Sequence, residues 1–343
     1  MARIPSNLVG LFTQALKTFE LSDSTFRVLC SLPSSASSSS SPTPAAPVFA
    51  PAEPPPRPPR YVFVLDSSFN PPTLAHRRMV ISALSDPRYF TPAPRDTESN
   101  EQHGTPETTR ASSSRVLLLL AINNADKAPK PASFPHRLAM MYAFAQDILA
   151  SSPRKQVGET QSDDVGCEAV DIAVTTEPYF HAKARAIAAS AFYHGVKGAD
   201  TAEGTVNRVV AEQVYLTGYD TLIRIFNPKY YPDDSMRTAL DPFFAHAGLR
   251  VTMRTDDEWG DEAAQVAYLE ALRAGGLEGV GGRVEWVDKI DLVHGRRGDE
   301  VVVSSTKVRD AVRRRDWEGL RGLVGKGVIS WIRENGLYAS DDK

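Results

Sequence analysis

Residues 61–76, YVFVLDSSFNPPTLAH, join a strand to a turn and then to a helix that carries a histidine near its start. The first five residues, 61–65, are apolar or β-favouring throughout, which is typical of a strand buried on both faces in a parallel sheet. Asp66 ends this run, and the polar, proline-bearing residues 67–73 turn the chain. Apolar residues then recur at helical spacing over residues 74–84. The stretch therefore predicts the first strand, turn and helix of an α/β fold.

The turn at residues 67–73 has the features of a phosphate site. A turn of this kind brings backbone amides and the positive end of a helix dipole to the carboxyl edge of the sheet, where open α/β folds hold phosphate groups. His76 lies one turn inside the predicted helix, so its imidazole can reach a phosphoryl oxygen bound there. Thr73, three residues earlier on the same helix face, can add a hydroxyl.

The bulk composition excludes several classes of protein. The chain has 343 residues, of which 42% are hydrophobic, and a net charge of −3, whereas nucleic-acid-binding domains are usually strongly basic. No apolar run reaches the roughly 18 residues of a membrane span. Cys30 and Cys167 are too few for a disulfide framework or a zinc cluster, which favours a reducing compartment. We therefore expect neither nucleic acid nor a membrane as a partner, and a location in the cytoplasm, the nucleus or both.

Two stretches are poor in core-forming residues. Residues 32–60 are dominated by Ser, Pro and Ala, and residues 91–114 are rich in Thr, Ser, Glu and Pro. We expect the first to be a linker and the second a disordered insert. Residues 1–31 then form an N-terminal helical segment that packs on the domain or on a partner, and residues 61–340 form a single domain.

Strand and helix patterns alternate along this domain. After the opening unit, strands are predicted at residues 115–122, 167–174, 213–216, 249–253 and 284–287, and helices at residues 134–149, 178–193, 258–273 and 307–315. This alternation predicts an α/β fold with a doubly wound, Rossmann-like parallel sheet and a C-terminal helical segment. The ligand cleft is expected at the carboxyl ends of the strands.

A second candidate anion site lies near the C-terminus. Three consecutive hydroxyl residues, Ser304, Ser305 and Thr306, stand at the start of a predicted helix, and Lys307 and Arg309 add positive charge. Hydroxyls, helix amides and basic side chains together favour a bound anion. The same residues also fit a helix cap with solvated basic side chains, and taken alone the two interpretations stand about even.

Both segments resemble signatures of the nucleotidyltransferase superfamily. Residues 67–76 are similar to its G-[ST]-F-[ND]-P-x-[HT]-x-x-H segment, with Ser67 where the superfamily usually has glycine. Residues 303–309 resemble its I-S-S-T-x-[IV]-R segment. The threonine at position 73 and the tail at residues 328–340 look like the eukaryotic nicotinamide mononucleotide adenylyltransferases. Two signatures in the right order favour the anion site over capping alone.

The resemblance implies transfer of an adenylyl group from ATP, as its Mg²⁺ complex, to the phosphate of nicotinamide mononucleotide, giving NAD and pyrophosphate. It implies catalytic roles for His76, Thr73 and Arg309, and no dedicated metal site, since Mg²⁺ bridges phosphates and keeps much of its water shell. The residues that it implies for binding the ATP phosphates are Ser67, Ser68, Phe69, Asn70, Ser304, Ser305, Thr306 and Lys307.

The acceptor side is predicted from residues that follow other strands. Gly218 and Asp220 match the family's G-x-D-x-L segment, where glycine allows close backbone approach and the aspartate can accept from a ribose hydroxyl or an amide. An aspartate at a helix start is also favourable to the helix dipole in any protein.

Three further positions complete the predicted acceptor site. By resemblance, Lys127 meets a substrate phosphate and Arg254 contacts a nucleotide. Tyr179 or Phe180 offers a stacking surface where the family places a tryptophan, although aromatic residues at such positions more often belong to a core.

Two other functions stay open at this stage. The first is a sister nucleotidyltransferase with another acceptor, such as pantetheine phosphate or a phospho-alcohol. The second is a catalytically weak member of the superfamily that serves as a nucleotide-binding scaffold. The sequence leaves the oligomeric state undetermined.

Overall fold

The computed structural model describes residues 5, 7–34, 52, 54–90, 113–123, 131–151, 167–194, 211–231, 235–254, 259–295 and 301–339. Within them, one sheet contains the strands β1 (Phe26–Pro33), β2 (Tyr61–Asp66), β3 (Ser114–Ala121), β4 (Cys167–Thr175), β5 (Glu212–Gly218), β6 (Ala247–Thr252) and β7 (Ile290–Val293). Their order is β1-β4-β3-β2-β5-β6-β7. All neighbours are parallel except β1, which runs antiparallel to β4. The predicted doubly wound α/β fold is confirmed.

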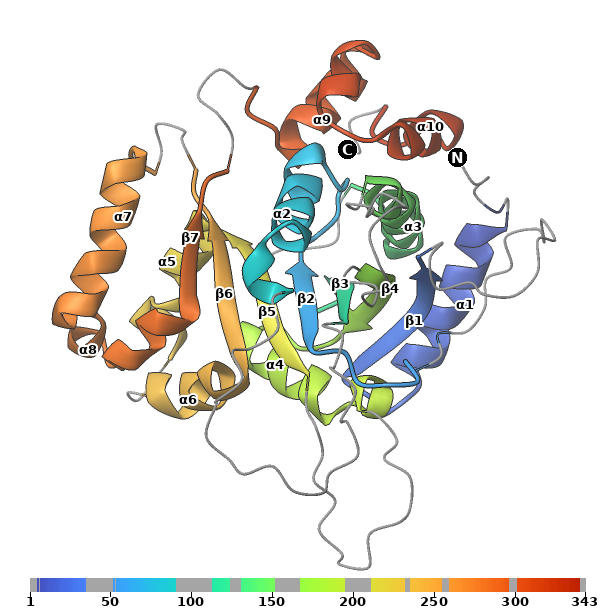
Figure 1. Ribbon diagram of the computed structural model, residues 1–343. Helices are drawn as coiled ribbons and strands as arrows, with labels where there is room; N and C mark the ends of the chain where they lie inside the picture. Colours follow the sequence, from blue (N-terminus) through green and yellow to red (C-terminus); the bar gives the residue numbers. More distant parts are fainter. Residues whose placement is uncertain are drawn as a thin grey trace, which may run out of the picture.

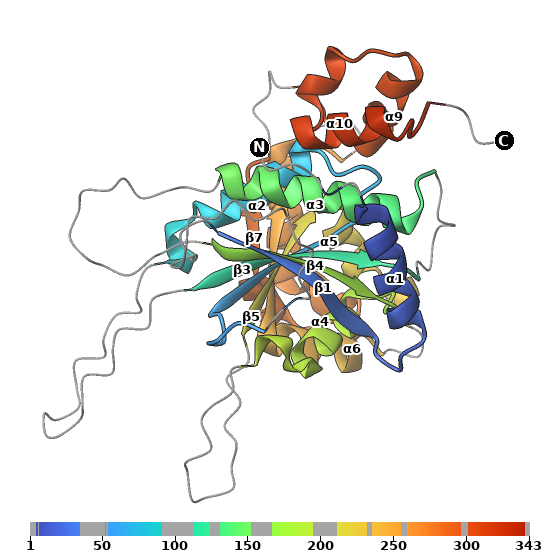
Figure 2. The same cartoon turned by 90° about the vertical axis from the view of Figure 1, so that its right-hand side faces the viewer.

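Helices cover both faces of the sheet (Figures 1 and 2). The helices of the first core are α1 (Leu8–Glu20), α2 (Leu74–Leu84), α3 (Phe134–Ser151), α9 (Ser305–Arg313) and α10 (Lys326–Glu334). Those of the second core are α4 (Phe180–Ala189), α5 (Tyr219–Ile225), α6 (Met236–His246), α7 (Glu262–Ala271) and α8 (Leu277–Gly279). Residues 61–65 of β2 enter the two cores in alternation, as expected for a strand buried on both faces.

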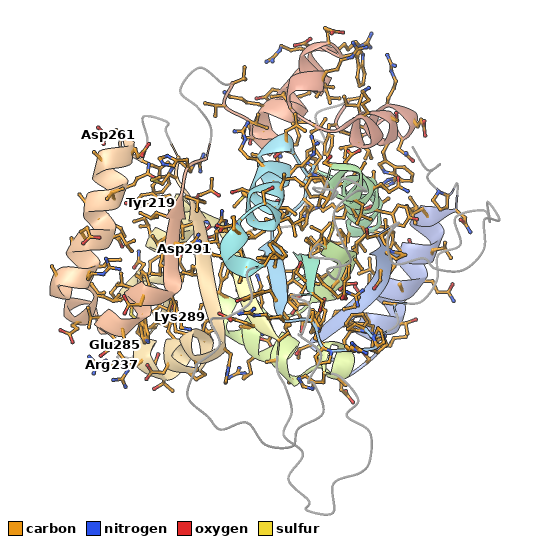
Figure 3. All side chains as sticks on the ribbon, in the orientation of Figure 1. Tyr219, Arg237, Asp261, Glu285, Lys289 and Asp291 are labelled. Atoms are coloured by element: carbon orange, nitrogen blue, oxygen red, sulfur yellow. The ribbon has the colours of Figure 1, made fainter. Side chains whose placement is uncertain are left out.

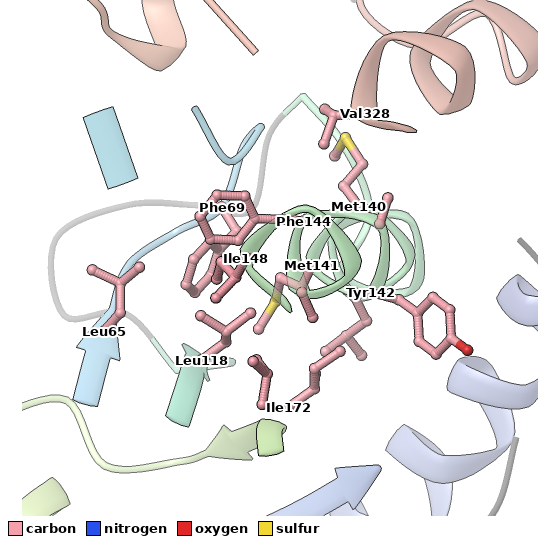
Figure 4. Packing of buried hydrophobic residues seen from close by; sticks show 14 of the residues in the cluster. Leu65, Phe69, Leu118, Met140, Met141, Tyr142, Phe144, Ile148, Ile172 and Val328 are labelled. Atoms are coloured by element: carbon pink, nitrogen blue, oxygen red, sulfur yellow. The ribbon is translucent and has the colours of Figure 1, made fainter. Parts of the chain in front are cut away.

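Helix α3 packs against the turn at residues 67–73. Residues 137–145 of this helix are all buried. Figure 4 shows Phe144 beside Phe69 of the turn and near Leu65 of β2, while Met140 points toward Val328 of α10. The turn therefore rests on a packed layer, which fixes its position relative to the sheet.

The topology predicts where a ligand binds. Strand β2 has β3 on one side and β5 on the other, so the chain changes winding direction between β2 and β5. Ligands of open α/β sheets bind at such a switch point, outside the carboxyl ends of the strands. In Figure 3, Tyr219 and Asp261 lie toward this edge, whereas Arg237 and Glu285 lie toward the opposite edge.

The N-terminal segment contains a strand that the sequence did not predict. Residues 1–31 were expected to be helical and residues 32–60 to be a linker, but only α1 is helical, and β1 at Phe26–Pro33 extends the sheet beside β4. Strand β1 was missed because it is a partly buried edge strand that runs directly into the Ser/Pro-rich stretch. Most of the predicted linker and insert, residues 35–51 and 91–112, lies outside the described residues, and Ser114 already belongs to β3.

The strand predicted at residues 284–287 is wrong. These residues lie in a 3₁₀ helix, Val284–Lys289, and the strand β7 follows it. The alternating pattern arose because Trp286 and Val287 are buried for another reason: the Trp286 ring stacks on Phe244, with 5.3 Å between ring centroids, and its Nε1–H donates to Asp241.

A buried carboxylate ties β1 to the sheet. Asp171 of β4 is fully buried and accepts hydrogen bonds from Ser31 Oγ, from Arg115 Nη2 at 2.8 Å and from Tyr193 Oη at 2.9 Å. Burial raises the pKa of Asp171, while the Arg115 guanidinium opposes that rise. Three partners from separate segments of the chain thus depend on one carboxylate.

Replacing Asp171 by alanine should therefore destabilise the fold. The change strands the Arg115 charge in the core, and breaking a buried pair in this way lowers the free energy of unfolding by about 3–5 kcal/mol. Urea denaturation measures the loss. Asp288→Ala is the control, because Asp288 is 78% exposed and surface substitutions usually stay within about 0.5 kcal/mol. Equal losses in both variants would contradict the role given to Asp171.

Candidate active site

A pocket of about 370 Å³ opens at the predicted edge of the sheet. Its walls come from the end of β2 and the start of α2, from the ends of β5 and β6, and from residues 301–305 in front of α9. The predicted site residues that line it are Ser67, Thr73, His76, Gly218, Asp220, Arg254, Ser304 and Ser305. Residues from both signature segments, far apart in the sequence, thus share one cavity.

The start of α2 holds the His76 imidazole at both ring nitrogens. The backbone N–H of Thr73, the N-cap residue, donates to His76 Nδ1 at 3.0 Å, and Thr73 Oγ1 lies 2.8 Å from the same nitrogen. His76 Nε2 lies 3.0 Å from Ser67 Oγ. His76 thus completes a capping box, where a glutamate or glutamine usually does so.

These contacts determine where the ring proton sits. A backbone N–H can only donate, so Nδ1 must be an acceptor and the proton lies on Nε2. Burial lowers the pKa of His76 to about 4. The histidine is therefore a neutral hydrogen-bond donor in the pocket wall and carries no positive charge near neutral pH.

The titration of His76 tests this assignment. The ring nitrogen NMR shifts of His76 should stay those of the neutral Nε2–H form down to about pH 5, whereas a free imidazole titrates near 6.5. Between about pH 4 and 6.5 the unfolded chain binds the extra proton, so His76 stabilises the fold above this range and loses that contribution as pH falls through it. His76→Gln should remove this pH dependence from urea unfolding. A His76 shift that titrates near 6.5 would contradict a neutral donor.

Ser67 takes part in this arrangement directly. Its hydroxyl accepts from His76 Nε2–H, which leaves the Ser67 proton available to donate. A glycine at this position has no group to do so. Hydrogen bonds therefore run from the Thr73 backbone N–H to His76 Nδ1, and from His76 Nε2–H to the Ser67 hydroxyl.

The second predicted anion site meets the turn at the start of α9. Ser304 and Ser305 line the pocket, and the N-terminus of α9 lies beside it. Ser304 Oγ accepts from the Lys307 backbone N–H, which caps the helix. Ser305 Oγ donates to the Pro71 carbonyl at 2.8 Å. Capping and proximity to the pocket are therefore combined in the same residues, and the two interpretations of this segment do not exclude each other.

Thr306, Lys307 and Arg309 lie outside the pocket wall. Thr306 and Lys307 are exposed. The Arg309 guanidinium donates to the Asn70 carbonyl at 2.8 Å and to Thr306 Oγ1 at 3.0 Å, so it joins α9 to the turn. The catalytic role predicted for Arg309 stays a prediction, and the structure gives Arg309 a clear part in positioning the turn.

The remaining turn residues differ in their surroundings. Asn70 is buried, and its Oδ1 accepts from the Tyr338 hydroxyl at 2.8 Å. Phe69 is fully buried at a positive φ of 45°, and its ring lies 5.8 Å from that of His76. Its side chain supports the imidazole and does not face the pocket. Ser68 is exposed and outside the pocket wall.

On the opposite wall, Asp220 and Arg254 form an ion pair of 3.2 Å. A Cβ at Gly218 would lie 2.6 Å from Asp220 Oδ1, so a larger residue here would displace the Asp220 carboxylate. Of the two aromatic candidates, Phe180 lines the pocket. Tyr179 is 42% exposed and stacks on His181 instead.

Several pocket residues were not predicted. Asp66, Arg78 and Thr217 all line the cavity. Asp66 and Thr217 stand at the carboxyl ends of buried strands, a position that could have singled them out. Arg78 looked like any polar residue of an amphipathic helix. Lys127, the predicted phosphate ligand, lies outside the described residues.

In the part of the chain that the structure describes, no group of three or more His, Cys, Asp or Glu side chains is placed to hold a metal ion. Among the same residues, every helix is too short or too polar to cross a bilayer.

The turn with its fixed imidazole lies beside a second helix N-terminus on a doubly wound sheet, and this arrangement fits the nucleotidyltransferase class that the two sequence segments resemble. A protein of Schizosaccharomyces pombe named "Putative nicotinamide mononucleotide adenylyltransferase" is 30% identical over 274 residues, which cover 79% of this chain and 84% of that protein. The chain therefore belongs to the nicotinamide mononucleotide adenylyltransferase family, and it is an enzyme of the nucleotidyltransferase class. No protein-family model matches the chain.

Two solved structures of Plasmodium falciparum nicotinic acid mononucleotide adenylyltransferase are also similar. The complex with NaAD has a TM-score of 0.43 at 14% identity, and the complex with APC has 0.42 at 12%. Each alignment covers 83% of this chain and 100% of the other. The fold assignment rests on the strand order described above and not on these scores.

Proposed function

We propose that the protein transfers the adenylyl group of ATP to the 5′-phosphate of nicotinamide mononucleotide, forming NAD and pyrophosphate. The observation that carries this proposal is the neutral Nε2–H donor of His76, which shares a pocket with Ser304 and Ser305 at the start of α9. The name of the S. pombe relative supports the choice of acceptor.

The reaction needs no covalent enzyme intermediate. A phosphate oxygen of the acceptor attacks the α-phosphorus of ATP, the bond from that phosphorus to the bridging oxygen of the β-phosphate breaks, and pyrophosphate leaves. No proton has to move, so catalysis consists of in-line positioning and stabilisation of charge on the α-phosphoryl oxygens. A neutral donor suits this step, since His76 can give a hydrogen bond without having to lose a proton.

In the proposed reaction, the N-terminal ends of α2 and α9 bind different phosphates of ATP. When ATP binds, we expect the Nε2–H of His76 to exchange Ser67 Oγ for the α-phosphoryl group, to which the Ser67 hydroxyl can also donate. The N-terminus of α9 then binds the outer phosphates. Arg309 keeps the two halves together through Asn70 and Thr306. Mg²⁺ enters with ATP as part of the substrate and bridges phosphate oxygens.

An acceptor panel tests the proposal. Purified full-length protein is incubated with Mg-ATP and one acceptor at a time, and pyrophosphate release is followed. We expect release with nicotinamide mononucleotide and none without an acceptor. Release only with pantetheine phosphate or a phospho-alcohol would replace the proposal with a sister activity. Silence across the panel, with ATP still bound in a calorimeter, would favour a nucleotide-binding scaffold.

A further inference from the structure

The C-terminal segment, residues 301–339, holds the start of α2 through the backbone. The N–H of Leu74, the first helical residue, donates to the Leu323 carbonyl at 2.9 Å. The first amides of a helix have no acceptor within the helix, so they bind an anion or an acceptor from elsewhere in the chain. Figure 1 shows α9 and α10 beside the ends of α2 and α3. The position of α2, and with it that of His76, therefore depends on a segment far later in the sequence.

Tyr338 extends this contact to the turn in front of α2. Its hydroxyl donates to Asn70 Oδ1 at 2.8 Å, and the residue is only 7% exposed. Burial raises the pKa of Tyr338, so the hydroxyl keeps its proton and remains a donor. Asn70 is thus held twice by the C-terminal segment, at its side chain by Tyr338 and at its carbonyl by Arg309.

The end of α10 brings Tyr338 back toward the turn. Gly336 has a φ of 60°, and the Leu337 N–H donates to a carbonyl of the last helical turn, a pattern that ends many helices. Tyr338 follows with a φ of 63°, in the left-handed region that bulky residues seldom adopt. A residue keeps such a backbone only where its surroundings hold it, often at a functional site. For Tyr338, these surroundings include Met140 and Asn70.

We propose that Tyr338 is a positioning residue for the adenylyl transfer: its hydroxyl holds Asn70, and through the turn it holds the His76 imidazole in the pocket. This inference rests on the proposed function. The connection is short, since Asn70 lies three residues before Thr73, whose backbone N–H and hydroxyl contact His76 Nδ1. Without the Tyr338 hydroxyl, the buried Asn70 Oδ1 loses a donor, and the turn can move to replace it.

Tyr338→Phe tests this inference, because it keeps the ring and removes only the hydroxyl. We expect kcat to fall by about tenfold, less than the roughly 10²-fold of a 1 Å misplacement, since Arg309 and Ser305 still hold the turn. The dissociation constant of ATP should change much less. Calorimetry measures this constant and the fraction of protein that binds ATP, and kcat is normalised to that fraction. A loss of folded protein is thereby separated from a loss of positioning.

A double-mutant cycle with Asn70→Ala tests the route from Tyr338 to the pocket. If Tyr338 acts through Asn70, adding Tyr338→Phe to Asn70→Ala should change kcat by less than about twofold. The ring nitrogen NMR shifts of His76 provide a second readout that needs no turnover. Tyr338→Phe should change these shifts in wild-type protein and leave them unchanged in Asn70→Ala. A full effect of Tyr338→Phe in both backgrounds would overturn the inference.

Tyr193→Phe is the matched control. Tyr193 is 2% exposed, and its hydroxyl donates to Asp171 at 2.9 Å, outside the pocket wall. This variant also loses one buried tyrosine hydrogen bond, but it should keep the kcat and the His76 shifts of wild type. Equal effects in the two tyrosine variants, or a Tyr338→Phe protein with wild-type kcat or wild-type His76 shifts, would overturn the inference. If wild-type protein forms no dinucleotide with any acceptor, the proposed function fails instead, and the His76 shifts alone decide the inference.

Discussion

Replacing His76 by alanine should lower kcat by about 10²–10³-fold, the usual loss when one preorganised donor to a developing negative charge is removed. In the proposed reaction the Nε2–H of His76 donates to the α-phosphoryl group in place of Ser67 Oγ, and that group gains charge mainly in the transition state. Binding of ATP should change much less, since the start of α9 is left intact. Steady-state kinetics give kcat, and calorimetry gives the dissociation constant of ATP.

Two variants sharpen this test. His76→Gln keeps an N–H donor of similar reach without an ionisable ring, so it should recover part of the lost kcat. His246→Ala removes an exposed histidine at the end of α6 and should behave as wild type. Unchanged turnover in His76→Ala, or an equal loss in His246→Ala, would remove His76 from the mechanism.

Replacing Arg309 by methionine should lower kcat/KM for ATP by about 10²-fold, the usual loss when reacting groups are misplaced by about 1 Å. The variant loses the contacts from the guanidinium to the Asn70 carbonyl and to Thr306 Oγ1. The turn that carries His76 is then no longer tied to α9, and misplacement of reacting groups by even an ångström is costly.

Arg313→Met is the matched control, because Arg313 lies one turn further along α9 and its side chain is 42% exposed. Its kcat/KM should stay within about twofold of wild type. Arg309→Lys keeps the charge but not the two-pronged geometry, and should recover activity only in part. Full activity in Arg309→Met would contradict the proposal that Arg309 holds the turn at residues 67–73 against α9.

The parts of the fold that were predicted correctly are those whose pattern reflects full burial. Strands β2 and β3 and helix α3 are covered on nearly every side, so their sequences are apolar with few interruptions. Strand β1 lies at the sheet edge, and β7 has only four residues, so neither needs a clear apolar pattern. Trp286 produced a false strand because stacking on Phe244 buries it without any sheet pairing.

For the site, sequence order and helix starts were enough to bring His76 and Ser304 to one cavity. The sequence could not give the protonation of His76, because that depends on the backbone amide of Thr73 pointing at Nδ1. Nor could it give the pair of Asp66 and Lys183, which are 117 residues apart and follow no local pattern. Contacts of this kind arise only from the packing of α4 against the end of β2.

The most direct measurement follows the phosphorus of ATP. Wild-type protein is incubated with nicotinamide mononucleotide and Mg-ATP labelled at the α-phosphorus, and in a parallel reaction with ATP labelled at the γ-phosphorus. We predict that the α-label appears in a dinucleotide and the γ-label in pyrophosphate. Release of the γ-label as inorganic phosphate, or an α-label that stays in adenine mononucleotides, would contradict adenylyl transfer as the activity of this site.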